Sequence, residues 1–153
     1  MSSATVVAVH RERSGRPMPS SLSVQLRMQR QSSRDTPIEV AFRRILHRRG
    51  LRVRIHRRPL PAVRRTADLV FTRARVAVYV DGWFWHGCPD HYMEPLSNGD
   101  YWLPKIEGNR RRDADTAAQL ASASWLAFRV WEHEDLDSAV DRLQAILVER
   151  VSA

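Results

Sequence analysis

Two short apolar runs separated by a polar turn constrain the fold of this chain more than any other feature. The runs are TADLVF (residues 66–71) and VAVYVDG (residues 76–82), and the polar stretch TRAR lies between them. Apolar runs that flank a short polar turn are typical of a β-hairpin. Because a hairpin places its two strands side by side, we expect Asp68 to lie beside the backbone of Val80 and Asp81.

A helix is expected before this hairpin. Thr36 is placed to cap it, Pro37 would be its first residue, and Glu39 completes a capping box. Gly50 would end the helix. Its expected buried residues are Val40, Phe42, Ile45 and Leu46.

The remaining patterns complete an alternating order of elements. Residues 51–58 alternate apolar and basic side chains and predict a strand, residues 101–123 a helix, and residues 125–132 a fourth strand, and Asp137 would cap a terminal helix. The expected packing residues of the long helix are Trp102, Leu103, Ile106, Ala114, Ala117 and Leu120. The order α-β-β-β-α-β-α predicts an α/β domain with a mixed sheet flanked by helices.

Charge divides the chain into two unequal parts. Through Arg65 there are 16 Arg against three acids, and from Thr66 onward nine Lys or Arg stand against 14 acids. The basic part indicates a nucleic-acid partner, and a generic basic surface is the alternative. Residues 1–33 are rich in Ser, Arg and Pro without sustained periodicity, so we expect a flexible arm there and one compact domain at 34–153.

The single cysteine and the distribution of apolar residues bear on the compartment. Cys88 has no second cysteine to pair with, which fits the reducing cytoplasm. No segment approaches about 18 consecutive apolar residues, and the first residues lack the apolar core of a secretory signal. We therefore expect a cytoplasmic protein without a membrane span.

Oxygen-bearing positions around the hairpin are candidates for a metal site. The carboxylates of Asp68 and Glu39 and the backbone carbonyl of Val80 would suit Mg²⁺, which prefers oxygen ligands. Local sequence also gives each acid an ordinary role, Glu39 in the capping box and Asp68 in a turn.

The segment VDGWFWHGCPDH (residues 80–91) carries further chemistry. His86 would be a general base beside a metal, because an imidazole titrates near working pH, or simply a packed histidine. Cys88 and His91 have a chelating spacing and, with His133, would offer zinc three ligands. Some aromatic residues and one methionine would either pack in the core or insert between DNA bases: these are Trp83, Phe84, Trp85, Trp102 and Met28.

Taken together, these stretches resemble the very short patch repair (Vsr) mismatch endonucleases over about residues 26–149. The resemblance is carried by SRDTPIEVAFRRIL, TADLVF, VAVYVDGWFWHGCPDH, YWLPKIEGNRRRD and WLAFRVWEHE. It implies a restriction-endonuclease-like α/β/α fold. It also implies Mg²⁺-dependent nicking of double-stranded DNA beside a T·G mismatch left by deamination of 5-methylcytosine.

The resemblance implies catalytic roles for individual residues. Asp68 would bind Mg²⁺ together with the carbonyl of Val80, and Glu39 would hold a metal-bound water. His86 would be the general base, and Asn109 matches a residue near the phosphate.

The resemblance also implies a DNA wedge. Phe84, Trp85 and Trp102 match the aromatic residues that enter the duplex beside the mismatch, and Met28 lies in the arm that approaches from the opposite groove. Because a mismatched pair is already weakened, the cost of unstacking falls selectively there.

Two positions depart from the family pattern. Asp81 stands where some members have His, which leaves its catalytic role open. Trp83 stands where members usually have a zinc-binding Cys, whereas Cys88, His91 and His133 match the other three ligands. Either zinc is held by three ligands and a water, or Trp83 fills the space and no zinc is bound.

The expected partner is double-stranded DNA with a T·G mismatch, acted on by a monomer, and mismatch-repair proteins are further candidate partners. One alternative is a Vsr-related nuclease of different specificity, linked to restriction or defence. The other is a non-catalytic DNA-binding module, which the change at Trp83 would explain.

Overall fold

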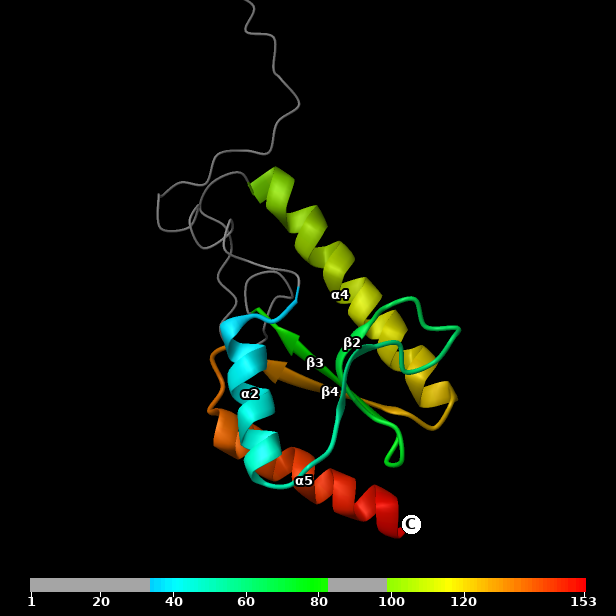
Figure 1. Cartoon of the computed structure of the whole chain (residues 1–153). Coiled ribbons are helices and arrows are strands. Elements are labelled where there is room, and N and C mark those ends of the chain that lie inside the picture. Colours follow the sequence, from blue (N-terminus) through cyan, green and yellow to red (C-terminus); the bar gives the residue numbers. More distant parts are fainter. Residues whose placement is uncertain (1–33, 83–98) are drawn as a thin grey trace, which may run out of the picture.

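Four strands form one mixed sheet in the computed structural model, which describes residues 34–82 and 99–153 (Figure 1). In their order across the sheet, the strands are β1 (Arg54–Arg57), β2 (Ala67–Phe71), β3 (Val76–Asp81) and β4 (Leu126–Trp131). The first three strands pair antiparallel, whereas β4 runs parallel to β3. The predicted hairpin is confirmed, because β2 and β3 pair with Leu69 opposite Val78.

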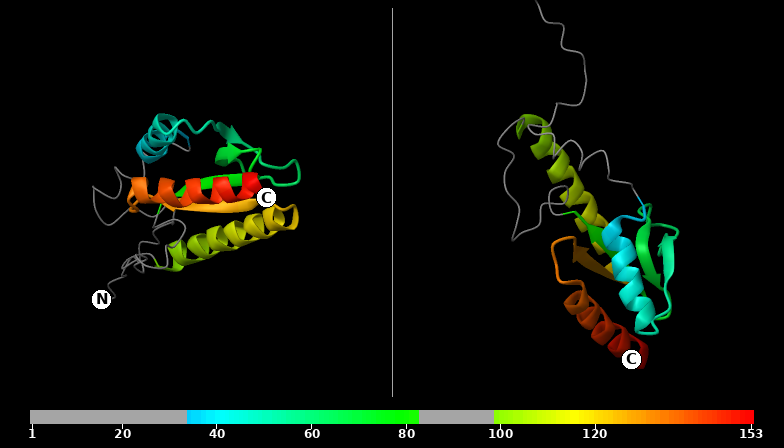
Figure 2. Two further views of the ribbon diagram at one scale, coloured as in Figure 1. Left: turned by 90° about the horizontal axis from the view of Figure 1, so that it is seen from below. Right: turned by 60° about the vertical axis from the view of Figure 1, so that its left-hand side comes forward.

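Helices cover both faces of this sheet. α2 (Pro37–Arg48) and α5 (Leu136–Ser152) lie on one face, and α4 (Gly99–Ser122) lies on the other (Figure 2). The predicted α/β fold with helices on both faces is therefore confirmed. The predicted N-terminal arm, residues 1–33, lies outside the described residues. Within the described part of the chain, no helix has the length and apolar character that crossing a bilayer requires.

Each face of the sheet buries its own apolar cluster. On the first face, the completely buried Phe42 and Leu46 of α2 and Leu143 of α5 pack against strand residues such as Val78. The smaller cluster on the second face contains Val63, Ala67, Val70, Ala77, Tyr79 and Leu120. The stripe predicted for α2 is confirmed at Phe42, Ile45 and Leu46, whereas Val40 is only half-buried.

α4 faces the sheet differently from the prediction. Its buried positions are Ile106, Asp113, Thr116 and Leu120. The expectation that Leu103, Ala114 and Ala117 are packing residues was wrong, because all three are exposed. Two polar side chains take the inner positions instead, and Asp113 forms ion pairs with arginines on the sheet side.

The start of α5 also differs from the prediction. The N-cap is Asp135, not Asp137, because the Asp135 carboxylate accepts hydrogen bonds from the Ser138 amide at 2.9 Å and the Ser138 hydroxyl at 2.7 Å. Asp137 follows inside the first turn, where a negative charge is still favourable to the helix dipole.

The capping box predicted at the start of α2 forms with one difference: the Glu39 carboxylate accepts from the Asp35 amide and not from the amide of the N-cap residue Thr36. The Thr36 hydroxyl accepts a hydrogen bond from the Glu39 amide at 3.3 Å and donates one to Glu39 Oε1 at 3.1 Å. Glu39 Oε2 accepts from the Asp35 amide at 3.0 Å. At the other end Gly50 adopts φ +73°, a conformation that side chains rarely tolerate. The box also determines where the buried carboxylate of Glu39 lies.

We expect Thr36→Ala to lower the free energy of unfolding by about 1 kcal/mol, because the first turn of α2 loses both hydrogen bonds of the hydroxyl. Urea denaturation followed by circular dichroism measures this change. Thr36→Ser keeps the hydroxyl and should lose less than half as much. Equal losses in the two variants would show that the hydroxyl does not carry the cap.

Candidate active site

Asp68 lies beside the end of β3, as the hairpin predicts. Its Oδ2 accepts a hydrogen bond from the Val80 amide at 2.7 Å. The next carbonyl, that of Asp81, accepts from Glu132 at 3.1 Å and therefore points toward β4. Because the amide and carbonyl of one strand residue point to the same side, the Val80 carbonyl points toward β2, where Asp68 lies.

Burial and neighbouring carboxylates act together on Asp68. The pKa of Asp68 is raised to about 6, chiefly by burial and further by the charges of Glu39 and Asp81, while the Val80 amide and Arg65 act in the opposite direction. Around Asp68, the negative charge of neighbouring carboxylates therefore outweighs the positive charge of the neighbouring arginine. A divalent cation would offset this charge, and the donor set of carboxylate and carbonyl oxygens fits Mg²⁺.

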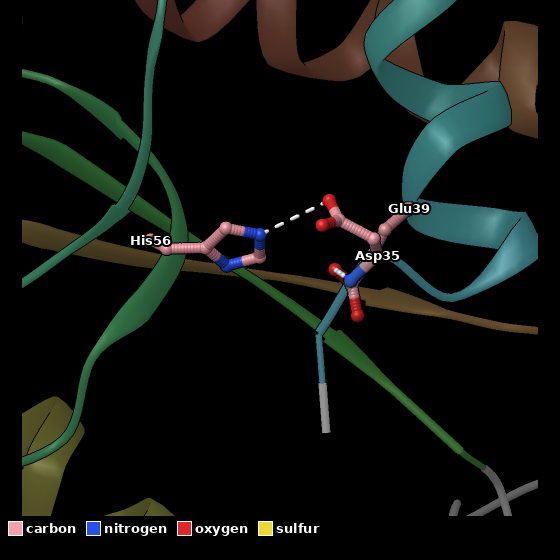
Figure 3. A group of neighbouring side chains, drawn as sticks. All are labelled: Asp35, Glu39 and His56. Carbon is pink, nitrogen blue, oxygen red and sulfur yellow. Dashed lines mark hydrogen bonds and ion pairs between the residues drawn. The ribbon is translucent and has the colours of Figure 1, made fainter. Parts of the chain in front are cut away.

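Glu39, whose charge acts on Asp68, also belongs to a group of three neighbouring side chains (Figure 3). One carboxylate oxygen from each of Asp35 and Glu39 and one ring nitrogen of His56 lie within 4.8 Å of one another. His56 Nε2 lies 3.2 Å from Asp35 Oδ1, and Arg43 forms an ion pair with the same oxygen at 2.6 Å. The hydrogen bond from His56, followed by that from Arg43, lowers the pKa of Asp35. The group could bind a cation, but Arg43 already balances the charge of Asp35.

Sequence reasoning missed Asp35 and His56. Both adopt positive φ, 54° and 47°, which turns the chain just before α2 and within β1. Asp and His both adopt this conformation more often than most side chains, but neither residue lies in a sequence pattern that predicts it.

Four charged side chains form an ion network on the α4 side of the sheet. Asp81 is 2% exposed, and its Oδ1 lies 3.0 Å from Arg65 and its Oδ2 2.8 Å from Arg129. Asp113, on α4, also pairs with both arginines, including a 3.0 Å contact between its Oδ2 and Arg129 Nη1. Sequence reasoning missed three members of this network, because Arg65, Asp113 and Arg129 all lie in charged or mixed stretches that suggest a solvated surface.

A pocket of about 440 Å³ lies between α4 and the sheet beside this network. Arg65, Arg110 and Arg129 contribute positive charge to its lining, and Trp131 contributes an aromatic surface. Among the described residues the buried Tyr79 hydroxyl has no hydrogen-bond partner, and burial raises the pKa of Tyr79 to about 12. The exposed Ala114 and Ala117 line the same pocket, where their small side chains leave space.

The structure places only some of the other predicted residues. Asn109 is half-buried on α4, four residues before Asp113, and its Oδ1 accepts a hydrogen bond from Arg112. His133 is exposed, and its ring stacks on that of Trp131 with centroids 6.4 Å apart. Several predicted residues lie outside the described part of the chain: Met28, Trp83, Phe84, Trp85, His86, Cys88 and His91, together with the side chain of Trp102. The general base, the wedge and most of the zinc site therefore stay predictions.

Comparison with known proteins identifies a family and several relatives that this chain resembles. The family model described as DNA mismatch endonuclease Vsr matches residues 23–91. Type II nicking enzyme V.NaeI of Lentzea aerocolonigenes is 40% identical over 126 residues, 81% of this chain and 76% of that protein. Type II nicking enzyme V.XorIIP of Xanthomonas oryzae pv. oryzae is 44% identical over 124 residues, 78% and 88% of the two chains. DNA mismatch endonuclease Vsr of Escherichia coli is 30% identical over 102 residues, 66% and 64% of the two chains.

Proposed function

The chain belongs to the Vsr family and is a DNA endonuclease, and from this premise we propose that it nicks one strand of double-stranded DNA beside a T·G mismatch. Mg²⁺ is the proposed cofactor, and a monomer is the proposed active form. Mismatch-repair proteins are further candidate partners.

The arrangement around Asp68 is the observation that carries this proposal. A half-buried carboxylate with a pKa of about 6 lies within hydrogen-bonding distance of the Val80 amide, at the edge where β3 ends. A carboxylate whose pKa is raised by burial and by neighbouring carboxylates is a candidate for binding a cation.

The proposed reaction assigns one task to each residue. Asp68 and the Val80 carbonyl would hold the cation, and Glu39 would orient a water bound to it. Mg²⁺ would supply electrostatic stabilisation of the negative charge that develops on the phosphate. His86 would accept the proton of the attacking water at its ring nitrogen, and Asn109 would orient the phosphate.

Mismatch preference is proposed to come from the aromatic residues after β3. Phe84, Trp85 and Trp102 would enter the duplex on one side, and Met28 would approach from the other groove. Unstacking costs a few kcal/mol per base step and costs least where a base pair is already weak. The wedge would therefore open T·G sites in preference to matched ones.

We expect strand-specific nicking of a duplex that carries one T·G mismatch, in the presence of Mg²⁺. The assay compares end-labelled duplexes that differ only in that base pair, each set in several sequence contexts. The matched duplexes are the control and should be nicked at least about tenfold more slowly, since unstacking a sound pair costs more. Equal rates on matched and mismatched duplexes would contradict the mismatch specificity.

Equal rates would instead favour a second candidate function. Two of the relatives carry the name type II nicking enzyme. This name gives a nicking activity without a mismatch, so a Vsr-related nuclease of different specificity, linked to restriction or defence, is the second candidate. Cleavage of one sequence context regardless of the mismatch would identify that function.

Structural zinc is a separate part of the proposal. Cys88, His91 and His133 would be its ligands, and Trp83 replaces the fourth. Metal analysis of the purified protein distinguishes a zinc content near one per chain from a content near zero, which would mean that Trp83 fills the space.

A further inference from the structure

The ion network on the α4 side of the sheet joins two layers of the fold. Asp81 ends β3, whereas Asp113 lies in the middle of α4. Arg65 precedes β2 and Arg129 lies in β4, and each guanidinium contacts both carboxylates. We call these four residues the clamp.

Burial divides the clamp into two unequal kinds of group. The side chains of Asp81 and Asp113 are 2% and 6% exposed, whereas those of Arg65 and Arg129 are 28% and 29% exposed. A buried carboxylate is tolerated only where opposite charge and hydrogen bonds compensate its lost hydration. Each carboxylate therefore depends on the two arginines, whereas an arginine that loses one carboxylate still reaches water.

Ring contacts restrict the two guanidinium groups. Arg65 lies over the Tyr79 ring at 4.7 Å from its centroid, and Arg129 lies over the Trp131 ring at 5.4 Å. A guanidinium that is stacked on a ring and bridges two carboxylates has little freedom to rotate. The clamp is thus a rigid connection between β3 and α4, not a loose surface pair.

This connection joins two parts of the proposed site. Asp81 directly follows Val80, whose carbonyl is a proposed metal contact. Asn109 lies one helical turn before Asp113 on the same side of α4, and it is the proposed phosphate contact. Holding Asp81 against Asp113 therefore fixes the strand end with the metal contact relative to the helix with the phosphate contact.

We propose that Arg65 and Arg129 are positioning residues of this nuclease, and that Asp81 anchors the end of β3 through them and does not act on the metal or the water. The proposal rests on the proposed nuclease site. It differs from the assignment of a catalytic role to Asp81, because both of its carboxylate oxygens lie within ion-pair distance of a guanidinium. Oδ1 accepts a hydrogen bond from Arg65, and Oδ2 lies 2.8 Å from Arg129 Nε in an ion pair without hydrogen-bond geometry.

The test is a double-mutant cycle on the rate constant of nicking. The variants are Asp81→Asn, Asp113→Asn and the double variant, because loss of a carboxylate leaves only arginines that reach water. Asp141→Asn is the matched control, since Asp141 also pairs with an arginine but lies exposed on α5. Single-turnover nicking under saturating enzyme and Mg²⁺ separates the rate constant from the fraction of active enzyme.

Each single variant should lower the rate constant about 10- to 100-fold, as expected for a reacting group displaced by a fraction of an ångström to about one ångström. The double variant should be no more than about threefold slower than the slower single one, because both changes release the same connection. Asp141→Asn should stay within about twofold of the wild type. The Mg²⁺ concentration at half-maximal rate should change by the same factor in Asp81→Asn and Asp113→Asn. Arg129→Lys keeps the positive charge but loses the two-pronged guanidinium, so its rate constant should lie between those of the wild type and of these variants.

Three outcomes would contradict the proposed positioning role of the clamp. One is a double variant whose loss equals the product of the two single losses, which would mean independent roles. Another is a Mg²⁺ requirement that rises for Asp81→Asn alone, which would make Asp81 a metal ligand. The third is a lower active fraction with an unchanged rate constant, which would mean a purely structural role.

Failure of the proposed function gives a different result. A wild-type protein that nicks matched and mismatched duplexes equally overturns only the mismatch specificity, and the cycle then uses whichever duplex is nicked. A wild-type protein that cleaves no duplex overturns both proposals.

Discussion

Asp68→Asn is expected to lower the rate of Mg²⁺-dependent nicking by about 1,000-fold or more, because the proposed site loses its central carboxylate ligand. The amide oxygen of asparagine can still accept the hydrogen bond from the Val80 amide that Asp68 Oδ2 accepts at 2.7 Å. The backbone at the end of β3 should therefore stay in place. The loss would then report the missing charge and not a displaced strand.

Binding of the duplex should survive this substitution. Affinity for DNA comes mainly from cationic contacts to phosphates, and removal of a negative charge near the phosphate does not weaken them. Fluorescence anisotropy without divalent cations should give a Kd within about threefold of the wild type. Asp137→Asn, which removes an exposed carboxylate on α5, is the matched control and should nick at the wild-type rate. Nicking by Asp68→Asn within about tenfold of the wild type would remove Asp68 from the site.

The part of this site that sequence could predict is local. Asp68 and Val80 belong to two strands joined by a short turn, so the hairpin alone brings them together. The capping box that holds Glu39 is likewise complete within a few residues. Hairpins and caps are determined by neighbouring residues, and for this reason their geometry can be read before the fold is known.

The clamp could not be predicted in this way. Arg65 and Asp113 are 48 residues apart in sequence and meet only when α4 packs on the sheet. Asp113 lies in the stretch NRRRDADT, which is typical of a solvated helix face, and yet its side chain is buried. The same packing leaves Ala114 and Ala117 exposed in the pocket between α4 and the sheet. Such contacts depend on the rotation of a helix about its axis, and a helix with both polar and small apolar residues on several sides leaves this rotation undetermined.

Asp68→Asn should also have a large effect on stability, and whereas it lowers the nicking rate it should make the metal-free protein more stable. Without metal, Asp68→Asn is expected to raise the free energy of unfolding at pH 7 to 8 by about 2 kcal/mol. The pKa of Asp68 is about 6 in the folded protein, against 3.8 for an ordinary aspartate. A shift of one pKa unit corresponds to about 1.4 kcal/mol, and the partial exposure of Asp68 reduces the total. The charged carboxylate thus destabilises the fold that holds it.

The pH dependence follows from the same shift. Because the folded state binds the proton more tightly than the unfolded state, the contribution of Asp68 is most favourable below about pH 4 and declines as the pH rises toward 6. Above about pH 7 the carboxylate is ionised in both states, and the cost stays constant. The stability of Asp68→Asn should therefore exceed that of the wild type by an amount that grows as the pH rises from about 4 through 6 and then levels off. Chemical denaturation in EDTA across this range measures the difference.

A divalent metal should raise the thermal stability of the wild type but not that of Asp68→Asn. A cation that binds the ionised carboxylate of the folded protein stabilises that state by mass action, so Mg²⁺ or Mn²⁺ should raise the Tm of the wild type at pH 8. The Tm of Asp68→Asn should not respond, because the proposed ligand is gone. Asp115→Asn, which changes an exposed carboxylate on α4, should behave as the wild type in both measurements. Two results would contradict a cation site at Asp68. One is a metal-free Asp68→Asn variant that is less stable than the wild type, and the other is an equal rise of the Tm of the variant and of the wild type when metal is added.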